Sequence, residues 1–157
     1  MELMLKDSVT LAFLGDAVYE LAVRRVLIER GGIYAADKLH RAAVRYVRAS
    51  AQAKALRGIL KAMDCGAVPA MTEGSDVSSF VGLTGESTSI ILDEEALTVC
   101  RRARNHKPKT VPKNADPLEY KMATALEALI GYLSLEGRDE EVQALIDLSM
   151  QIIDSKE

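Results

Sequence analysis

The stretch LAFLGDAVYELAVRRV, residues 11–26, is the part of the sequence from which the fold can be argued most directly. It is apolar on nearly every side of a helix, which is typical of a buried helix. Asp16 and Glu20 nevertheless lie in its middle, and because positions i and i+4 share a helical face, both carboxylates point the same way. Carboxylates are seldom buried without a partner. The stretch therefore predicts a core helix that presents acid to a defined site.

A second apolar stretch, MATALEALIGYLSL at residues 122–135, has one charged residue in its middle, Glu127. Two core helices that each present an acid predict a metal site between them. Mg²⁺ is typically held by one or two carboxylates together with water and substrate phosphates, so Asp16 and Glu127 are the expected ligands. The alternative for Asp16 is a buried acid hydrogen-bonded to a helix end. For Glu20 an ion pair with Arg24, one turn later, is the alternative to metal binding.

Length and composition favour one globular domain with its own core. The chain has 157 residues, of which 48% are hydrophobic. No apolar run reaches the roughly 18 residues of a membrane span, and the N-terminus MELMLKDS does not resemble a signal peptide. Cys65 and Cys100 are too few and too isolated for a disulfide framework or a zinc site. We expect a cytoplasmic protein with free thiols and no membrane association.

Charge is unevenly distributed along the chain, although the net charge is only −3. Residues 38–61 contain seven Lys or Arg and no Asp or Glu, and residues 101–113 contain six and again none. Residues 114–157 contain ten Asp or Glu and three Lys or Arg. Such segregation creates local positive fields on an acidic protein, which favours binding of a polyanion.

Helix start and stop signals predict six helices and no strands. N-caps are expected at Ser8, Asp37, Ser50, Asp93 and Asp116. The helices are expected to span about residues 8–30, 38–49, 51–63, 94–104, 117–135 and 139–153. Residues 106–115 form a basic loop, and residues 64–92 a long surface excursion that could include short strands. The fold class is therefore all-α.

Several motifs resemble those of the ribonuclease III family. FLGDAVYEL, residues 13–21, is similar to the signature helix of that family, and LEALIGYLSLEG, residues 126–137, to its second acidic helix. The closer resemblance is to the compact, single-domain branch called Mini-ribonuclease III. There it extends to KLHR at 38–41, RARN at 102–105 and PKNADPLEYKMATALEALIGYL at 112–133, and covers most of the chain.

The resemblance implies a ribonuclease III-like endonuclease domain over residues 1–157, of about six helices, that forms a homodimer and lacks a double-stranded-RNA-binding domain. It further implies a Mg²⁺-dependent endoribonuclease that cuts double-stranded RNA, leaves 5′-phosphate and 3′-hydroxyl ends, and matures the 23S ribosomal RNA precursor. Asp16 and Glu127 would be catalytic and bind Mg²⁺, with Glu20 as a candidate third ligand.

Two positions depart from the larger enzymes of the family. Ala12 and Thr124 stand where those enzymes have a glutamate and an aspartate. The compact branch also works with a reduced acid set, so activity is still expected, and the departure concerns the number of bound metal ions. The alternative is a non-catalytic, ribosome-associated RNA-binding protein on the same fold.

The basic segments are the expected RNA contacts, because duplex RNA is recognised mostly through its shape, phosphates and 2′-hydroxyls. Lys38, Arg41, Arg45 and Arg48 are spaced three, four and three residues apart and so form one stripe on a helix. The asparagines of the second segment could instead cap helix ends, and His40 is interpreted as packed or hydrogen-bonded. The second set of expected RNA contacts is Arg101, Arg102, Arg104, Asn105, Lys107, Lys109, Lys113 and Asn114.

The first helix has more apolar residues than one small core can use. A surplus of this kind predicts a subunit interface, and a two-fold dimer would match the two antiparallel strands of an RNA duplex. The apolar residues concerned are Leu11, Phe13, Leu14, Val18, Leu21, Val23 and Val26.

Overall fold

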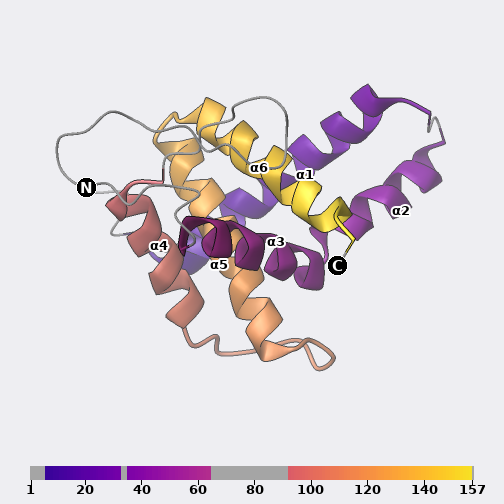
Figure 1. Ribbon diagram of the computed structural model, residues 1–157. Helices are drawn as coiled ribbons and strands as arrows, with labels where there is room; N and C mark the ends of the chain where they lie inside the picture. The colour runs from indigo at the N-terminus through magenta and orange to yellow at the C-terminus, as the bar shows by residue number, and fades with distance from the viewer. Residues whose placement is uncertain (1–5, 33–34, 65–91, 157) are drawn as a thin grey trace.

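The computed structural model describes residues 6–32, 35–64 and 92–156, and within them it contains six helices and no strand. The all-α prediction is confirmed for these residues, whereas the interior of the predicted excursion, 65–91, lies outside them. The helices are α1 Ser8–Arg30, α2 Ala36–Val47, α3 Ala49–Asp64, α4 Glu94–Asn105, α5 Pro117–Leu135 and α6 Asp139–Asp154 (Figure 1).

Helix α5 is the central element of the bundle. Ten of its 19 residues are buried, which its run of Ala, Leu, Ile and Tyr makes favourable. Helices α1, α3, α4 and α6 all pack against it, while α2 contacts α1 and α3 (Figure 1). A polar residue in the middle of a helix that is buried on this many sides has little contact with solvent, and Glu127 is such a residue.

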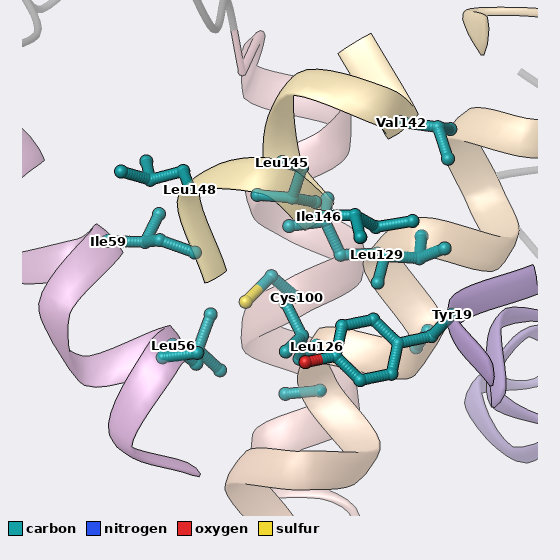
Figure 2. Packing of buried hydrophobic residues seen from close by; sticks show 14 of the residues in the cluster. Tyr19, Leu56, Ile59, Cys100, Leu126, Leu129, Val142, Leu145, Ile146 and Leu148 are labelled. Atoms are coloured by element: carbon teal, nitrogen blue, oxygen red, sulfur yellow. The ribbon is translucent and has the colours of Figure 1, made fainter. Parts of the chain in front are cut away.

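The core lies between α5, α3 and α6. In Figure 2, Leu145 and Ile146 of α6 lie beside Leu129 of α5, with Leu56 of α3 across from them. All four side chains are fully buried. Cys100 of α4 is buried next to this group and is a free thiol, as expected. Burial of these aliphatic side chains supplies most of the driving force that holds the bundle together.

Two of the predicted helix caps are confirmed by their hydrogen bonds. The Asp116 carboxylate accepts from the backbone N–H of Leu118 at 2.8 Å, and Pro117 occupies the first position of α5. The Asp93 carboxylate accepts from the N–H of Ala96 at 2.8 Å. Asp93 also accepts from Arg138 at 2.8 Å, which fixes the start of α4 to the turn between α5 and α6.

The other three predicted caps are wrong by one or two residues. Helix α1 begins at Ser8, so Asp7 precedes it, and α2 begins at Ala36, so Asp37 lies in its first turn. The Asp37 carboxylate accepts from Arg41 at 2.9 Å instead of capping the helix. Helix α3 begins at Ala49, which places Ser50 inside it.

The C-terminal ends of α2 and α6 meet the α1 side of the bundle through a polar cluster. The Tyr46 hydroxyl donates to the Asp154 carboxylate at 2.8 Å, and Arg45 forms an ion pair with Asp154 at 3.1 Å. The buried Tyr19 hydroxyl of α1 donates to the Tyr46 carbonyl oxygen at 3.2 Å. These bonds hold α2 in place and so define the surface on which its basic stripe lies.

Candidate active site

Helices α1 and α5 cross at two glycines. A Cβ added to Gly15 would lie 1.7 Å from the carbonyl oxygen of Glu127, and one added to Gly131 would lie 2.0 Å from the carbonyl oxygen of Leu11. Both distances are far below any permitted contact, and both contacts are with backbone, which cannot move aside. Only glycine at these two positions allows the helices to approach so closely.

This crossing brings the two predicted acids together. Asp16 follows Gly15 on α1 and is exposed, whereas Glu127 lies one turn before Gly131 on α5 and is mostly buried. Burial and then the nearby Asp16 charge raise the pKa of Glu127 to about 7, opposed by a hydrogen bond from the Gln52 side chain. Burial and the charge of Glu20 raise the pKa of Asp16. The site therefore concentrates the negative charges of Asp16, Glu127 and Glu20.

Glu20 lies beside this pair but is engaged elsewhere. Its carboxylate forms an ion pair with Arg24 at 3.1 Å, as expected from their spacing. The Glu20 charge still contributes to the raised pKa of both Asp16 and Glu127, so it interacts electrostatically with both acids. The ion pair is made by Oε2 of the Glu20 carboxylate.

The arrangement suits a hard divalent cation. Within the described residues, no three His, Cys, Asp or Glu side chains converge as a closed metal site. Mg²⁺ does not require one, because it usually keeps several waters and takes one or two carboxylates plus substrate oxygens. Asp16 and Glu127 have carboxylate oxygens that could serve in this way. A cation between them would offset both the burial of the Glu127 charge and its repulsion by Asp16, which raise the pKa of Glu127.

The two positions at which larger family members carry acids have ordinary structural roles here. Ala12 is 6% exposed and packs in the core. The Thr124 hydroxyl donates to the carbonyl oxygen of Tyr120 at 2.9 Å, one turn earlier in α5. Neither side chain can supply a negative charge, so the acids that lie together at this crossing, within the described residues, are Asp16, Glu127 and Glu20.

Gln52 is a site residue that the sequence did not indicate. It lies on α3, is 1% exposed, and donates through Nε2 to the Val47 carbonyl oxygen at 2.9 Å, and its side chain lowers the pKa of Glu127 against the effect of burial. In the sequence it is one polar residue in an alanine-rich helix. Its importance depends on the packing of α3 against α5, which no local pattern predicts.

Four of the predicted RNA-binding cations are already engaged within the chain. The pairs are Arg41 with Asp37, Arg45 with Asp154, Arg101 with Glu94, and Arg102 with the Lys6 carbonyl oxygen and the Ser8 hydroxyl. Arg102 thereby joins α4 to the start of α1, which is a structural role.

The remaining predicted RNA contacts are at least partly exposed, and their side chains form no hydrogen bond or ion pair within the described part of the chain. They are Lys38, Arg48, Arg104, Asn105, Lys107, Lys109, Lys113 and Asn114. Lys38 lies on α2 and Arg48 directly after it, and the others lie at the end of α4 or in the loop between α4 and α5. In Figure 1, α2 and this loop lie well apart. One molecule thus offers two separate basic regions.

A shallow pocket of about 210 Å³ lies between α1 and α2. Leu27, Ile28 and Leu39 form its apolar lining, and Arg24 and His40 are at its edge. His40 is exposed there and is not packed in the core as interpreted from the sequence. It belongs to the α1–α2 surface, whereas Asp16 and Glu127 belong to the crossing of α1 with α5.

An exposed apolar stripe follows α1. Phe13 is 84% exposed, Leu21 61% and Ile28 64%, and their spacing of about two turns keeps them on one face. Leu11 and Val23, on the opposite side of the helix, are fully buried in the core. The expected surplus of apolar residues on this helix is therefore present.

None of the described helices has the length and hydropathy needed to cross a membrane.

Comparisons with known proteins agree with this architecture. Residues 9–138 match the ribonuclease III domain family. A Mini-ribonuclease 3 from Symbiobacterium thermophilum is 39% identical over 145 residues, which cover 92% of this chain and 88% of that protein. A Mini-ribonuclease 3 from Brevibacillus brevis is 36% identical, with coverage of 97% and 91%. The crystal structure of a Fusobacterium nucleatum protein matches with a TM-score of 0.65 at 29% identity, with coverage of 92% and 91%.

Proposed function

The chain belongs to the ribonuclease III family, in its Mini-ribonuclease 3 branch, and we propose that it is a Mg²⁺-dependent endoribonuclease that cuts double-stranded RNA. The observation that carries the proposal is the convergence of Asp16 and Glu127 at the glycine crossing of α1 and α5. It unites the two acidic helices of the family in one site that can be reached from solvent through the exposed Asp16 side.

Asp16 and Glu127 have distinct tasks in this proposal. When bound, Mg²⁺ lowers the pKa of a water nucleophile and neutralises charge on the phosphate. Glu127 is held rigidly in α5 and fixes the position of the cation, while the exposed Asp16 completes the ligand set on the side that RNA approaches. Hydrolysis at this site would leave 5′-phosphate and 3′-hydroxyl ends.

The proposed working form is a homodimer. The stripe of Phe13, Leu21 and Ile28 on α1 leaves large side chains in contact with water, and pairing with a second copy would bury them. Asp16 lies beside Phe13 on the same helix, so a two-fold axis near this stripe would bring two acidic sites to one duplex. Each subunit would then cut one of the two antiparallel strands.

The proposed substrate is the large-subunit ribosomal RNA precursor in the cytoplasm, as the family resemblance implies. Single-stranded regions present no A-form groove, whereas a base-paired precursor stem presents phosphates at regular spacing. The lysines of the loop between α4 and α5, together with Lys38 on α2 and Arg48 directly after it, supply the phosphate contacts. Because these two regions lie apart, binding would extend along the duplex.

A second candidate function, RNA binding without catalysis, is favoured by the neutral Ala12 and Thr124 and by the absence of a closed three-ligand cluster in the described residues. It predicts that the acids at the crossing contribute nothing to turnover. The two candidates therefore differ in the consequence of removing one carboxylate.

The test compares the wild type with Asp16→Asn on a long RNA duplex, with Mg²⁺ and with EDTA. The variant keeps the shape of the side chain and removes the ligand charge, so cleavage should be lost while RNA binding persists. Asp139→Asn, which changes an exposed acid in the first turn of α6, is the matched control and should cleave normally. Cleavage by Asp16→Asn at the wild-type rate, or by the wild type in EDTA, would overturn the proposal.

A further inference from the structure

Side chains from three helices meet around the carboxylate of Asp154, the last residue of α6. Its Oδ1 accepts from the Tyr46 hydroxyl at 2.8 Å and forms an ion pair with Arg45 at 3.1 Å, both in the last turn of α2. Its Oδ2 forms an ion pair with Arg30, the last residue of α1, at 3.4 Å. In this group of four residues, the Asp154 cluster, one carboxylate is held by two guanidinium groups and one hydroxyl.

Both arginines of the Asp154 cluster also reach solvent. The side chain of Arg45 is 57% exposed and that of Arg30 is 47% exposed. The guanidinium group of Arg45 lies over the Tyr46 ring, 5.6 Å from its centre, which restricts its orientation. A guanidinium group has several N–H donors, and the ion pairs with Asp154 use one Nη atom of each arginine. Each arginine therefore has donors left for another acceptor.

The surroundings of the Asp154 cluster favour an anion. Two guanidinium groups oppose one carboxylate, and Arg48, directly after α2, adds an exposed cation. Lys54 donates to the carbonyl oxygens of Ile153 and Ser155 at 3.5 and 2.9 Å. Its charge offsets the partial negative charge at the C-terminal end of α6.

A phosphodiester has the features that these donors recognise in Asp154, because it also shares one negative charge between two oxygens. Arginine binds carboxylates and phosphates through the same planar fork of donors. Arg45 belongs to the basic stripe of α2, in which Arg41 and Arg48 lie on either side of it. Cations that follow one another along a helix match a chain of phosphates better than a single free phosphate ion.

We propose that Arg30, Arg45 and the Tyr46 hydroxyl bind one backbone phosphate of duplex RNA, and that Asp154 holds this position until the phosphate displaces it. This inference rests on the proposed function, which takes duplex RNA as the ligand, and it adds Arg30 to the expected RNA contacts. Asp154 is then an internal competitor that lowers the affinity for RNA. The RNA must break the ion pairs of Asp154 before it can use the two arginines.

A purely structural role makes a different prediction. If the Asp154 cluster only ties α2 and α1 to α6, Asp154→Asn lowers thermal stability and leaves the affinity for RNA unchanged. Loss of any acid also reduces the general repulsion of RNA, so the control must remove the same charge. Asp147 is suitable because it lies two turns earlier on α6, and its carboxylate accepts from the neutral Gln143 at 2.9 Å.

The test measures the Kd for a long RNA duplex in EDTA at several salt concentrations. Asp154→Asn should bind about 3-fold more tightly than the wild type, the size expected for an exposed ion pair that no longer has to be broken. Asp147→Asn should bind like the wild type. Arg30→Gln should bind more weakly, with a slope of log K against log salt that is shallower by roughly 1, because one phosphate contact is lost. Arg57→Gln, at an exposed position on α3, is its control and should keep the wild-type slope.

The outcomes separate this inference from the proposed function. If the wild type binds no duplex RNA, the proposed function fails and the phosphate site fails with it. If the wild type binds and cleaves the duplex, but Asp154→Asn binds no more tightly than Asp147→Asn, the phosphate site is overturned and the proposed function stands. A wild-type salt slope in Arg30→Gln has the same meaning, and it decides the matter if Asp154→Asn does not fold. Weaker binding by a folded Asp154→Asn would also overturn the inference, because Asp154 would then assist RNA binding.

Discussion

At the scale of single residues, the acidic site brings together carboxylates whose negative charges repel one another. Glu127 is mostly buried and lies near Asp16 and Glu20, and each of these conditions disfavours its ionised form. The Gln52 hydrogen bond offsets only part of this cost, because the pKa of Glu127 still rises to about 7. A cluster that destabilises its own ionised form is typical of a site that binds a cation.

The metal-free protein should therefore lose stability as the pH rises. The pKa of Glu127 increases from its ordinary value of 4.5 to about 7 on folding, so between these values the folded protein binds more protons than the unfolded chain. The contribution of Glu127 to stability is present below pH 4.5 and lost by about pH 7, a decrease on the order of 2 to 3 kcal/mol. Glu127→Gln, which cannot ionise, should remove most of this decrease.

Denaturant unfolding in EDTA at several pH values measures this effect. Glu140→Gln, at an exposed position on α6, is the control and should retain the full pH dependence. Identical pH profiles for the wild type and Glu127→Gln would contradict the burial of an ionisable group at the crossing. Glu127→Gln should also lose cleavage of duplex RNA, because the substitution removes a ligand charge.

Asp16 and Glu127 could be predicted from the sequence because each is a charge in an otherwise apolar helix. The pairing of Glu20 with Arg24 followed from their spacing and is confirmed. Gln52 could not be predicted, because its significance comes from Glu127 on a different helix. The sequence also could not indicate which arginines pair internally, since Arg102 meets groups at the start of α1.

At the scale of elements, the close crossing of α1 and α5 determines whether the site exists. Gly15 and Gly131 allow backbone contact between the two helices, and this contact sets the separation of Asp16 and Glu127. A glycine within a helix lowers its intrinsic stability by about 1 kcal/mol relative to alanine, so their presence here requires a packing reason. The crossing supplies that reason.

Gly15→Ala should be strongly destabilising. Its Cβ would lie 1.7 Å from the Glu127 carbonyl oxygen, so the helices must separate, at a cost of about 3 kcal/mol or more. The control is Gly58→Ala on α3, where the new Cβ would meet the Ile152 side chain at 2.9 Å, and a side chain can shift. Thermal unfolding should therefore show a large loss for Gly15→Ala and a clearly smaller one for Gly58→Ala. Similar losses for both would contradict the special role of the crossing.

The loop between α4 and α5 should contribute phosphate contacts. Replacing its unpaired Lys107, Lys109 and Lys113 by alanine should weaken RNA binding and reduce the slope of log K against log salt by roughly 2 to 3. The control replaces Arg57, Lys61 and Lys156, which are exposed and are not among the predicted RNA contacts. A salt slope unchanged by the loop substitutions would show that the loop does not contact the RNA backbone.

The positions of the helices in the sequence were easier to predict than which helices pack against each other. Asp116 followed by Pro117 is a strong local signal, and α5 begins where it indicates. Ser8 and Asp37 are weaker signals, and the helices near them begin at Ser8 and Ala36 without a side-chain cap hydrogen bond. The close α1–α5 crossing depends on two glycines 116 positions apart in the sequence, and no local pattern connects Gly15 with Gly131.

At the scale of the whole molecule, the proposed dimer connects the apolar stripe of α1 with the acidic site. Phe13 is 84% exposed, although a large aromatic side chain gains substantially from burial. The stripe runs along the same helix that carries Asp16. An interface on this helix would therefore set the distance between the two sites that act on one duplex.

Phe13→Asp should convert the protein to a monomer. A charge in an apolar interface loses its hydration without gaining a partner, so association becomes unfavourable. Light scattering should give about twice the subunit mass of 17.1 kDa for the wild type and the subunit mass for the variant. Leu118→Asp, at an exposed apolar residue of α5 outside the stripe, should remain a dimer. A monomeric wild type that cleaves duplex RNA would contradict the two-site account.

The central claim, that Asp16 and Glu127 hold one divalent cation between α1 and α5, can be tested by iron-directed cleavage of the protein chain. Fe²⁺ replaces Mg²⁺ at oxygen ligands, and with ascorbate and peroxide it generates hydroxyl radicals that cut only the nearby backbone. The account predicts two cuts, one close to Gly15 and one close to Glu127, both suppressed by excess Mg²⁺ and absent in Asp16→Asn. Cuts confined to other segments, or cuts that Mg²⁺ does not suppress, would contradict it.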